Sequence, residues 1–242
     1  MRIPRIYQDA TLASNLELAL DAVASQHLLK VLRLREGADL IIFDGQGNSY
    51  YGELTQASGK TAIVRLHAHV DQDSESPLQL HVGLGISKGE RMDYAIQKLV
   101  ETGVSSITPL QTAYTVVKLD PKREQSRMQH WHGVIINACE QCGRSYLPSL
   151  HAVHDINTWL SKAEADCKLV FDASGDTALR SIQPVPTRVC VLIGPEGGLS
   201  EQEINAAGQN GFLHIRLGPR ILRTETAAVA ISAALQTLWG DY

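Results

Sequence analysis

Long hydrophobic runs are missing from this chain of 242 residues. None approaches the roughly 20 apolar residues that a membrane-spanning helix requires. The N-terminus turns polar after its first few residues, which is unlike a secretory signal peptide. Because 44% of the residues are hydrophobic, the composition predicts ordinary globular cores. We therefore expect a cytoplasmic protein without membrane contact.

Cysteine is scarce as well, with four residues in the whole chain. Cys139 and Cys142 form one CxxC pair, whereas Cys167 and Cys190 lie singly and far apart. A zinc site needs two further ligands at motif spacing, and a thioredoxin-like redox pair follows a strand, whereas this pair lies in a predicted helix. The pattern favours reduced thiols and no bound metal.

A strong positive charge is also absent, since 22 Lys and Arg residues oppose 26 Asp and Glu residues, giving a net charge of −4. Such a chain does not coat nucleic acid through bulk electrostatics. Basic residues still gather locally, within the first 35 residues and around 216–223. Solvated faces are the simplest interpretation of both groups, so charge alone leaves the partner open.

An acidic, polar segment that ends in proline, residues 70–77, separates two different patterns and is typical of a connector. We place the domain boundary there and predict domains 1–72 and 73–242. The first domain combines one helical stretch with short β-like runs separated by glycine turns, which predicts a small β-barrel or sandwich. The expected helix is 21–31, and the expected strands are 39–43, 49–55 and 61–69.

The second domain alternates strands and helices, a pattern that predicts a mainly parallel sheet with helices on both faces. Strands are expected at 78–84, 106–110 and 168–171, and helices at 88–101 and 125–142. Residues 83–89 offer a GxGxxxG sequence after the first of these strands. Its spacing differs from the dinucleotide-binding motif, and no acid follows the next strand to hold a ribose, so an oxidoreductase is disfavoured.

Two glycine-bearing loops near the end of the chain carry the strongest functional signal. Residues 194–198 (GPEGG) follow an expected strand at 188–193, and the capping box of Ser200 and Glu203 starts a helix near residue 201. Residues 217–226 (LGPRILRTET) follow a strand at 212–217 and precede a helix that Thr224 or Thr226 could cap.

Both loops thus lie where open α/β sheets bind ligands, at the carboxyl ends of strands and the N-termini of helices. Glycine lets the backbone approach a flat ligand closely. A plain tight turn explains an isolated Gly-Pro pair equally well. The crowding of Arg220, Arg223 and Glu225 into the second loop favours a polar partner instead.

Residues 192–200 (LIGPEGGLS) and 217–227 (LGPRILRTETA) resemble the signature of the RsmE family, bacterial methyltransferases of 16S ribosomal RNA in the SPOUT superfamily. The likeness runs through nearly the whole chain and includes residues 2–5, 27–33, 87–93 and 138–144. It implies an α/β fold, with a C-terminal SPOUT-type α/β domain that ties a trefoil knot and a small N-terminal PUA-like β-barrel that grips RNA.

The resemblance also implies an activity: methyl transfer from S-adenosylmethionine to N3 of one uridine in 16S rRNA, on the assembled small ribosomal subunit, by a homodimer. The uracil N3 proton must leave, so the expected catalytic residues are Glu225, which could accept it, and Arg223, which could stabilise the anionic uracil. Glu140 and Arg144 could act from the other subunit if the family's dimer packing holds, although their i,i+4 spacing alone favours an intrahelical ion pair. The implied cofactor-binding residues are Phe171, Leu192, Ile193, Gly194, Pro195, Glu196, Gly197, Gly198, Leu217, Gly218, Arg220, Ile221, Leu222 and Thr226. The expected RNA contacts are Arg2, Arg5, Lys30, Arg33, Lys88 and Arg91.

The chain departs from the family after the strand that ends near residue 111. Family members usually carry Ser-Glu-Arg there, whereas this chain has Thr112, Ala113 and Tyr114. A cationic RNA contact is therefore missing or replaced by Tyr114, which could stack on a base. Two alternatives stay open: a related enzyme that methylates the ribose 2′-O, and a non-catalytic RNA-binding dimer.

Overall fold

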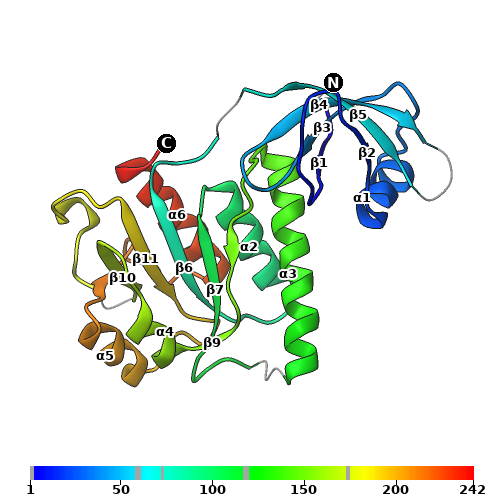
Figure 1. The fold of residues 1–242 in the computed structure, drawn as a ribbon. Helices are drawn as coiled ribbons and strands as arrows, with labels where there is room; N and C mark the ends of the chain where they lie inside the picture. Colours follow the sequence, from blue (N-terminus) through cyan, green and yellow to red (C-terminus); the bar gives the residue numbers. More distant parts are fainter. Residues whose placement is uncertain (1–2, 58–60, 72–73, 117–119, 173–174) are drawn as a thin grey trace. The chain divides into compact units, whose positions relative to one another are not determined.

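The computed structural model describes residues 3–57, 61–71, 74–116, 120–172 and 175–242 (Figure 1). The chain forms two compact units. Met1–Glu75 and Cys139–Leu147 make up the first unit, and Ser76–Ala138 and Pro148–Tyr242 make up the second. Within the described ranges, no helix is long and apolar enough to span a membrane. The inclusion of Cys139–Leu147 in the first unit is not predicted by the sequence, and the functional division at residue 72 stays a prediction.

The first unit is built on a five-stranded sheet with the order β1-β3-β4-β5-β2. The pairing of β1 with β3 is parallel, and the other pairs are antiparallel. Its elements are β1 (Arg5–Tyr7), β2 (Glu17–Ala19), α1 (Ala22–Gln26), the π-helix His27–Val31, β3 (Asp39–Phe43), β4 (Ser49–Gln56) and β5 (Ile63–His69). The three expected strands and the expected helical stretch are confirmed, whereas the short strands β1 and β2 are not anticipated.

Apolar side chains from successive strands form the core of this unit. Leu40, Ile42, Leu54, Val64 and Leu66 are fully buried in one cluster. The segment Cys139–Leu147 joins the unit through backbone hydrogen bonds. Leu147 N–H donates to the carbonyl of Gly45, and Gly47 N–H donates to that of Ser145, at 3.0 and 3.1 Å.

The second unit contains the predicted parallel sheet, with the order β12-β10-β11-β6-β7-β8 and with β9 also paired to β7. Every pairing in it is parallel. The strands are β6 (Gln79–Gly85), β7 (Ser106–Gln111), β8 (Ser149–Leu150), β9 (His154–Asp155), β10 (Cys167–Phe171), β11 (Arg188–Ile193) and β12 (Leu213–Ile215). The helices are α2 (Glu90–Glu101), α3 (Pro121–Cys142), α4 (Ile156–Lys162), the 3-10 helix Leu179–Ser181, α5 (Glu201–Gln209) and α6 (Thr224–Trp239).

Helices cover both faces of this sheet, as the alternating pattern predicts (Figure 1). The helices α2 and α6 contact each other on one face, and α4 and α5 do so on the other. The Trp159 ring of α4 lies directly over Gly83, where any Cβ atom would collide with it. Gly83 of the GxGxxxG sequence therefore serves helix–sheet packing.

The helix starts beside the two glycine loops differ in their caps. Ser200 and Glu203 form the predicted capping box at the start of α5. The N-cap of α6 is Arg223, and its side chain makes no capping hydrogen bond. The prediction of a threonine cap is therefore wrong, because Thr224 is already the first helical residue and Thr226 lies inside the first turn.

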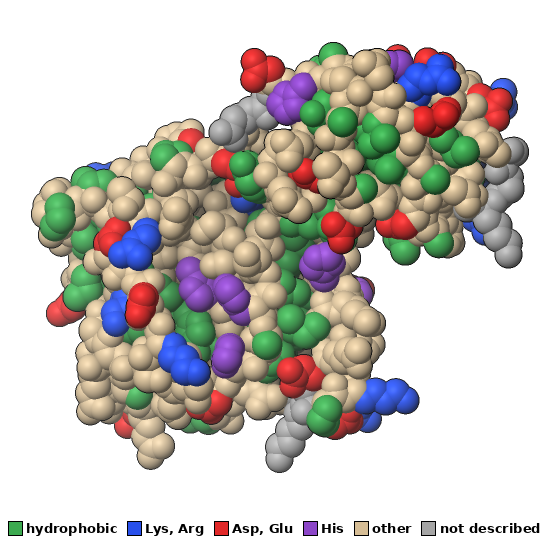
Figure 2. All heavy atoms as spheres, in the orientation of Figure 1, with side chains coloured by type: hydrophobic (Ala, Val, Ile, Leu, Met, Phe, Trp, Pro, Cys, Tyr) green, Lys and Arg blue, Asp and Glu red, His purple; other side chains and the backbone are tan. Residues whose placement is uncertain are grey.

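Histidine side chains gather on one face of the second unit (Figure 2). The rings of His81 and His151 lie 5.3 Å apart, and Nε2 of His81 is 2.8 Å from the Thr108 hydroxyl. Burial, and secondly the nearby His151, lower the pKa of His81 from 6.5 to about 4. Between these two pH values the unfolded chain binds a proton that the folded chain does not, so stability rises with pH across this window.

We expect His81→Gln to weaken this pH dependence. The contribution of His81 is complete above pH 6.5 and disappears as the pH falls toward 4. Lowering the pH from 7 to 5 should therefore destabilise the parent by about 2 kcal/mol more than the variant. Urea unfolding at both pH values measures the difference, and equal losses in the two proteins would refute this account of His81.

Candidate functional site

The carboxyl ends of the parallel strands meet at one edge of the second unit's sheet. The ends of β6, β10 and β11 bring together Gly85, Phe171 and Ile193 from three distant parts of the sequence. The loops that follow β11 and β12 are the two glycine-bearing loops singled out from the sequence. This edge is the usual ligand site of an open α/β sheet, because loops and helix N-termini converge there.

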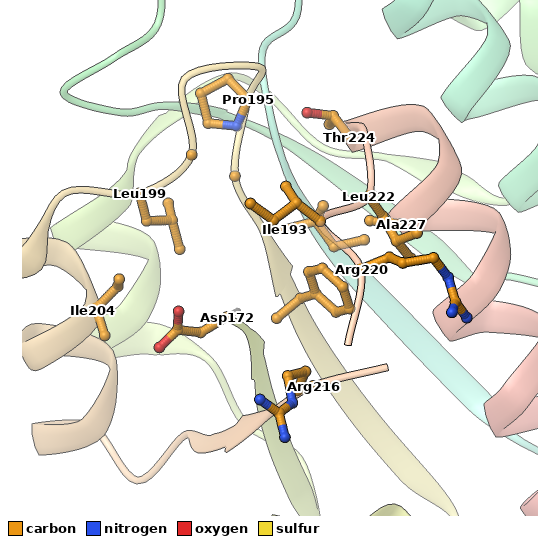
Figure 3. Close-up of a pocket in the computed structure, with 14 residues that line it drawn as sticks. Asp172, Ile193, Pro195, Leu199, Ile204, Arg216, Arg220, Leu222, Thr224 and Ala227 are labelled. Atoms are coloured by element: carbon orange, nitrogen blue, oxygen red, sulfur yellow. The ribbon is translucent and has the colours of Figure 1, made fainter. Parts of the chain in front are cut away.

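A pocket of about 190 Å³ lies between the two glycine loops. Figure 3 shows Leu199 and Ile204 on one side and Leu222 and Ala227 on the other, with Asp172 and Arg216 at one end. The lining residues are Phe171, Asp172, Ile193, Gly194, Pro195, Gly198, Leu199, Ile204, Arg216, Arg220, Ile221, Leu222, Thr224 and Ala227. Apolar walls with a few polar groups suit a flat aromatic ligand that carries hydroxyl or charged groups.

Asp172 supplies a carboxylate to this pocket. Its side chain is 10% exposed, and one oxygen lies 3.5 Å from Nδ1 of His214. A carboxylate can accept hydrogen bonds from ligand hydroxyls or amines, while the nearby Arg216 offers donors only. The end of the pocket can therefore recognise a ligand that has both donor and acceptor groups.

Glycine at two positions allows the first loop its close approach. A Cβ atom at Gly85 would lie 2.5 Å from both N and Cδ of Pro195, and one at Gly194 would lie 2.9 Å from the carbonyl carbon of Gly198. Only glycine leaves this space empty, so the end of β6 fixes the position of the loop. Gly85 is not a predicted site residue, and the GxGxxxG sequence is the signal that could have found it.

A second pocket adjoins the first and shares with it Pro195, Gly198, Ile221, Leu222 and Thr224. Gly197 and four charged residues complete its lining, the charged ones being Arg91, Glu196, Arg223 and Glu225. The Oε2 atom of Glu225 is buried and has no hydrogen-bond partner among the described residues. A buried carboxylate oxygen without a partner is costly, and it is ready to accept a proton or hydrogen bond from a ligand.

Glu196 ties the first glycine loop to the start of α2. Its Oε1 atom accepts hydrogen bonds from the Lys88 backbone N–H at 2.9 Å and from Nη1 of Arg91 at 3.2 Å. Burial raises the pKa of Glu196, but these hydrogen bonds outweigh burial and the net pKa is lowered. The carboxylate therefore stays charged and holds Arg91 at the mouth of the second pocket.

The structure places the predicted cofactor residues in three groups. Phe171, Ile193, Gly194, Pro195, Gly198, Arg220, Ile221 and Leu222 line the first pocket, whereas Glu196 and Gly197 line the second pocket and not the first. Leu192 is buried in the core, and Leu217, Gly218 and Thr226 lie outside the lining of both pockets. Sequence reasoning missed Leu199, Ile204, Arg216, Thr224 and Ala227 as lining residues, because their contact depends on how distant segments face each other.

Glu140 and Arg144 lie in the first unit and are engaged there. Glu140 accepts a hydrogen bond from the Tyr7 backbone N–H at 3.1 Å and lies 3.7 Å from Nδ1 of His27. Burial raises the pKa of Glu140, against the opposing effects of Tyr7 and His27. Arg144, with a side chain only 6% exposed, forms an ion pair with Glu75. Neither residue lines either pocket within one chain.

The predicted RNA contacts differ in their surroundings. Lys30 and Arg33 are exposed on the first unit, and Lys88 and Arg91 are exposed on the second, whereas Arg2 lies outside the described residues. Arg5 is partly buried and donates to the Ser145 hydroxyl at 2.8 Å, with its guanidinium over the Phe43 ring. These contacts give Arg5 a structural role that the sequence does not predict.

Known families match both parts of this chain. The RNA methyltransferase domain family matches residues 74–236, and the RNA methyltransferase PUA domain family matches residues 21–66. The Ribosomal RNA small subunit methyltransferase E of Buchnera aphidicola is 36% identical, over 99% of this chain and 98% of its own length. The protein of that name from Bacillus subtilis is 30% identical, over 89% of each chain.

Solved structures resemble the whole chain. The Ribosomal RNA small subunit methyltransferase E of Neisseria gonorrhoeae, bound to S-adenosylmethionine, has a TM-score of 0.93 and 35% identity over all of both chains. A Legionella pneumophila protein with bound S-adenosylmethionine has a TM-score of 0.97 and 38% identity, again over all of both chains. These similarities confirm the expected fold class, an N-terminal PUA-like domain followed by a SPOUT-type α/β domain.

We expect Gly85→Ala to destabilise the protein, because the new methyl group must displace the backbone of Pro195. Overpacking of this kind should lower the free energy of unfolding by about 1–3 kcal/mol. Gly133→Ala in α3 is a matched control, since a Cβ atom there meets nothing within 4 Å. It should raise the free energy of unfolding by roughly 0.5–1 kcal/mol. Urea unfolding measures both changes. If Gly85→Ala left the free energy of unfolding unchanged, the loop would not be held in place by its contact with Gly85.

Proposed function

Because this chain belongs to the RNA methyltransferase family, we propose that it transfers a methyl group from S-adenosylmethionine to N3 of a uridine in 16S rRNA of the small ribosomal subunit. One observation carries the proposal: two pockets share a wall of five residues, one suited to the cofactor and the other to the base. Methyl transfer requires the donor and the acceptor to be held in contact and in line.

The residues of the first pocket fit S-adenosylmethionine. Ile193, Leu199 and Leu222 offer apolar surface to an adenine ring, and Asp172 can accept hydrogen bonds from ribose hydroxyls or the cofactor's amine. The close glycine backbone at residues 194–198 can contact the ligand directly. When bound, this cofactor supplies a methyl group activated by a positively charged sulfur.

The second pocket provides the groups that the base requires. Uracil N3 carries a proton that must leave, and Oε2 of Glu225 is a buried acceptor without a partner among the described residues. Arg223 is the N-cap residue of α6 and lines the same pocket as Glu225. Its guanidinium can donate a hydrogen bond to a uracil oxygen, which stabilises the negative charge that develops as the proton leaves. Glu225 and Arg223 thus act as proton acceptor and anion stabiliser.

For Glu140 and Arg144 we propose a structural role in place of the catalytic one implied by the resemblance. Arg144 is buried and Glu140 is partly buried, and both bond within their own unit: Glu140 accepts from the Tyr7 backbone N–H of β1, and Arg144 pairs with Glu75. The family resemblance further implies a trefoil knot, a homodimer and a cytoplasmic location. These three properties stay predictions.

Two measurements test the proposal together. We expect S-adenosylmethionine to bind the purified protein in a calorimetric titration and to raise its melting temperature, because a ligand that binds only the folded state stabilises it. Radiolabelled methyl groups should then pass to small subunits isolated from cells that lack this protein. A protein that bound no cofactor, or one that bound it but left these subunits unlabelled, would contradict the proposed function.

We expect Arg223→Ala and Glu225→Gln each to lower the methylation rate by at least ~10²-fold, the usual scale for one oriented catalytic group. Affinity for S-adenosylmethionine should stay within about twofold, because neither side chain lines the first pocket. Arg188→Ala is a matched control, since Arg188 lies at the opposite end of β11, paired with Asp166. Single-turnover kinetics measure the methylation rate. A variant of Arg223 or Glu225 that lost affinity for S-adenosylmethionine but kept its methylation rate would show that the residue binds the cofactor and does not act in catalysis.

A further inference from the structure

A short loop after β7, residues 112–116, lies beside the first glycine loop. Its two largest side chains are unusually open to solvent, with Tyr114 52% exposed and Val116 76% exposed. Together with Ala113, Thr115 and Gly197 they line a shallow, open hollow. A Cβ atom at Gly197 would lie 2.8 Å from Cβ of Tyr114, so only glycine allows the two loops to meet here. The exposed Tyr114 ring therefore lies next to the backbone of Gly197, which has no side chain.

Hydrogen bonds hold this loop in place. The Ala113 backbone N–H donates to Oε1 of Glu203 at 2.7 Å, and Glu203 also accepts from Ser200 through its other oxygen. Glu203 is itself buried, so the anchor is protected from solvent. Within the loop, the Thr112 N–H donates to the Thr115 hydroxyl at 3.0 Å. A ring presented on an anchored loop loses little conformational entropy when a ligand stacks on it.

The hollow continues into the second pocket, because Gly197 lines both. The second pocket in turn shares its wall with the first, which gives three adjoining sites in a row. Two arginines and two glutamates line the middle site, namely Arg91, Arg223, Glu196 and Glu225, and Glu196 pairs with Arg91. An occupant that runs from the middle site into the hollow meets Arg223, which can pair with a phosphate, and the exposed Tyr114 ring, which can stack on a base. Phosphates and bases together are the chemistry of a single-stranded nucleic acid.

We propose that Tyr114, backed by Gly197 and flanked by Val116, is a stacking shelf for the RNA base next to the one in the second pocket. The shelf deepens the proposed function and rests on it for the position of the reacting base. Aromatic rings bind bases of any sequence through their faces, so the shelf supplies affinity and orientation rather than base identity. The Tyr114 hydroxyl has no part in this interaction.

The test compares Tyr114→Ala and Tyr114→Phe in the full-length protein. We expect Tyr114→Ala to weaken binding to small subunits from cells lacking this protein by roughly 10-fold, as the loss of one stacked base predicts. Tyr114→Phe should bind like the parent, because it keeps the ring. Affinity for S-adenosylmethionine should be unchanged in both variants, which also shows that they fold. Tyr242→Ala, which removes another exposed tyrosine at the chain end, should bind subunits normally.

Measuring subunit binding separately from methylation distinguishes the shelf from the catalytic proposal. If the parent methylates subunits but Tyr114→Ala binds them equally well, the shelf is wrong and the catalytic proposal stands. If Tyr114→Phe loses as much affinity as Tyr114→Ala, the hydroxyl is the contact and stacking is refuted. If the parent binds subunits without methylating them, and only Tyr114→Ala binds weakly, the shelf stands and the catalytic proposal falls.

Discussion

The contact between Gly85 and Pro195 fixes the geometry on which the site depends. Gly85 ends the central strand β6, and Pro195 is the second residue of the loop that follows the adjacent strand β11. The absence of a side chain at position 85 lets this loop approach the end of β6. This approach brings residues 194–198 opposite the loop after β12. Both pockets use Pro195 and Gly198 as a common wall. A bulkier residue at position 85 would therefore disturb the first and the second pocket together.

Three carboxylates near this wall differ in their surroundings, and so in what each can do chemically. Glu196 is satisfied by hydrogen bonds from the start of α2 and holds an arginine in position. Asp172 faces the first pocket beside His214, where it can recognise ligand hydroxyls or amines. Glu225 keeps one buried oxygen without a partner among the described residues, which is the state required of a proton acceptor. Residue type alone does not separate these roles, whereas hydrogen bonding and burial do.

The sequence predicted those parts of the fold that depend on local chemistry. Alternating strands and helices predicted the parallel sheet, and the Ser200–Glu203 spacing predicted the start of α5. Features that depend on distant contacts were not predictable in this way. Ile204 reaches the first pocket only through the packing of distant segments, and Cys139–Leu147 joins the first unit through backbone bonds with Gly45 and Gly47. The glycine loops were recognisable because their shape depends on glycine and proline themselves.

Primer extension across small-subunit RNA tests most directly the proposed role of Glu225 and Arg223 in methyl transfer to uridine N3. A methyl group at N3 blocks base pairing and stops the copying enzyme. RNA from cells lacking this protein should give no such stop, and the parent protein should restore one at a single uridine. Cells complemented with Glu225→Gln should show little or no stop. A primer-extension stop of parental strength in RNA from cells lacking the protein would contradict the proposed methylation. A stop of that strength in cells carrying Glu225→Gln would contradict the role proposed for Glu225.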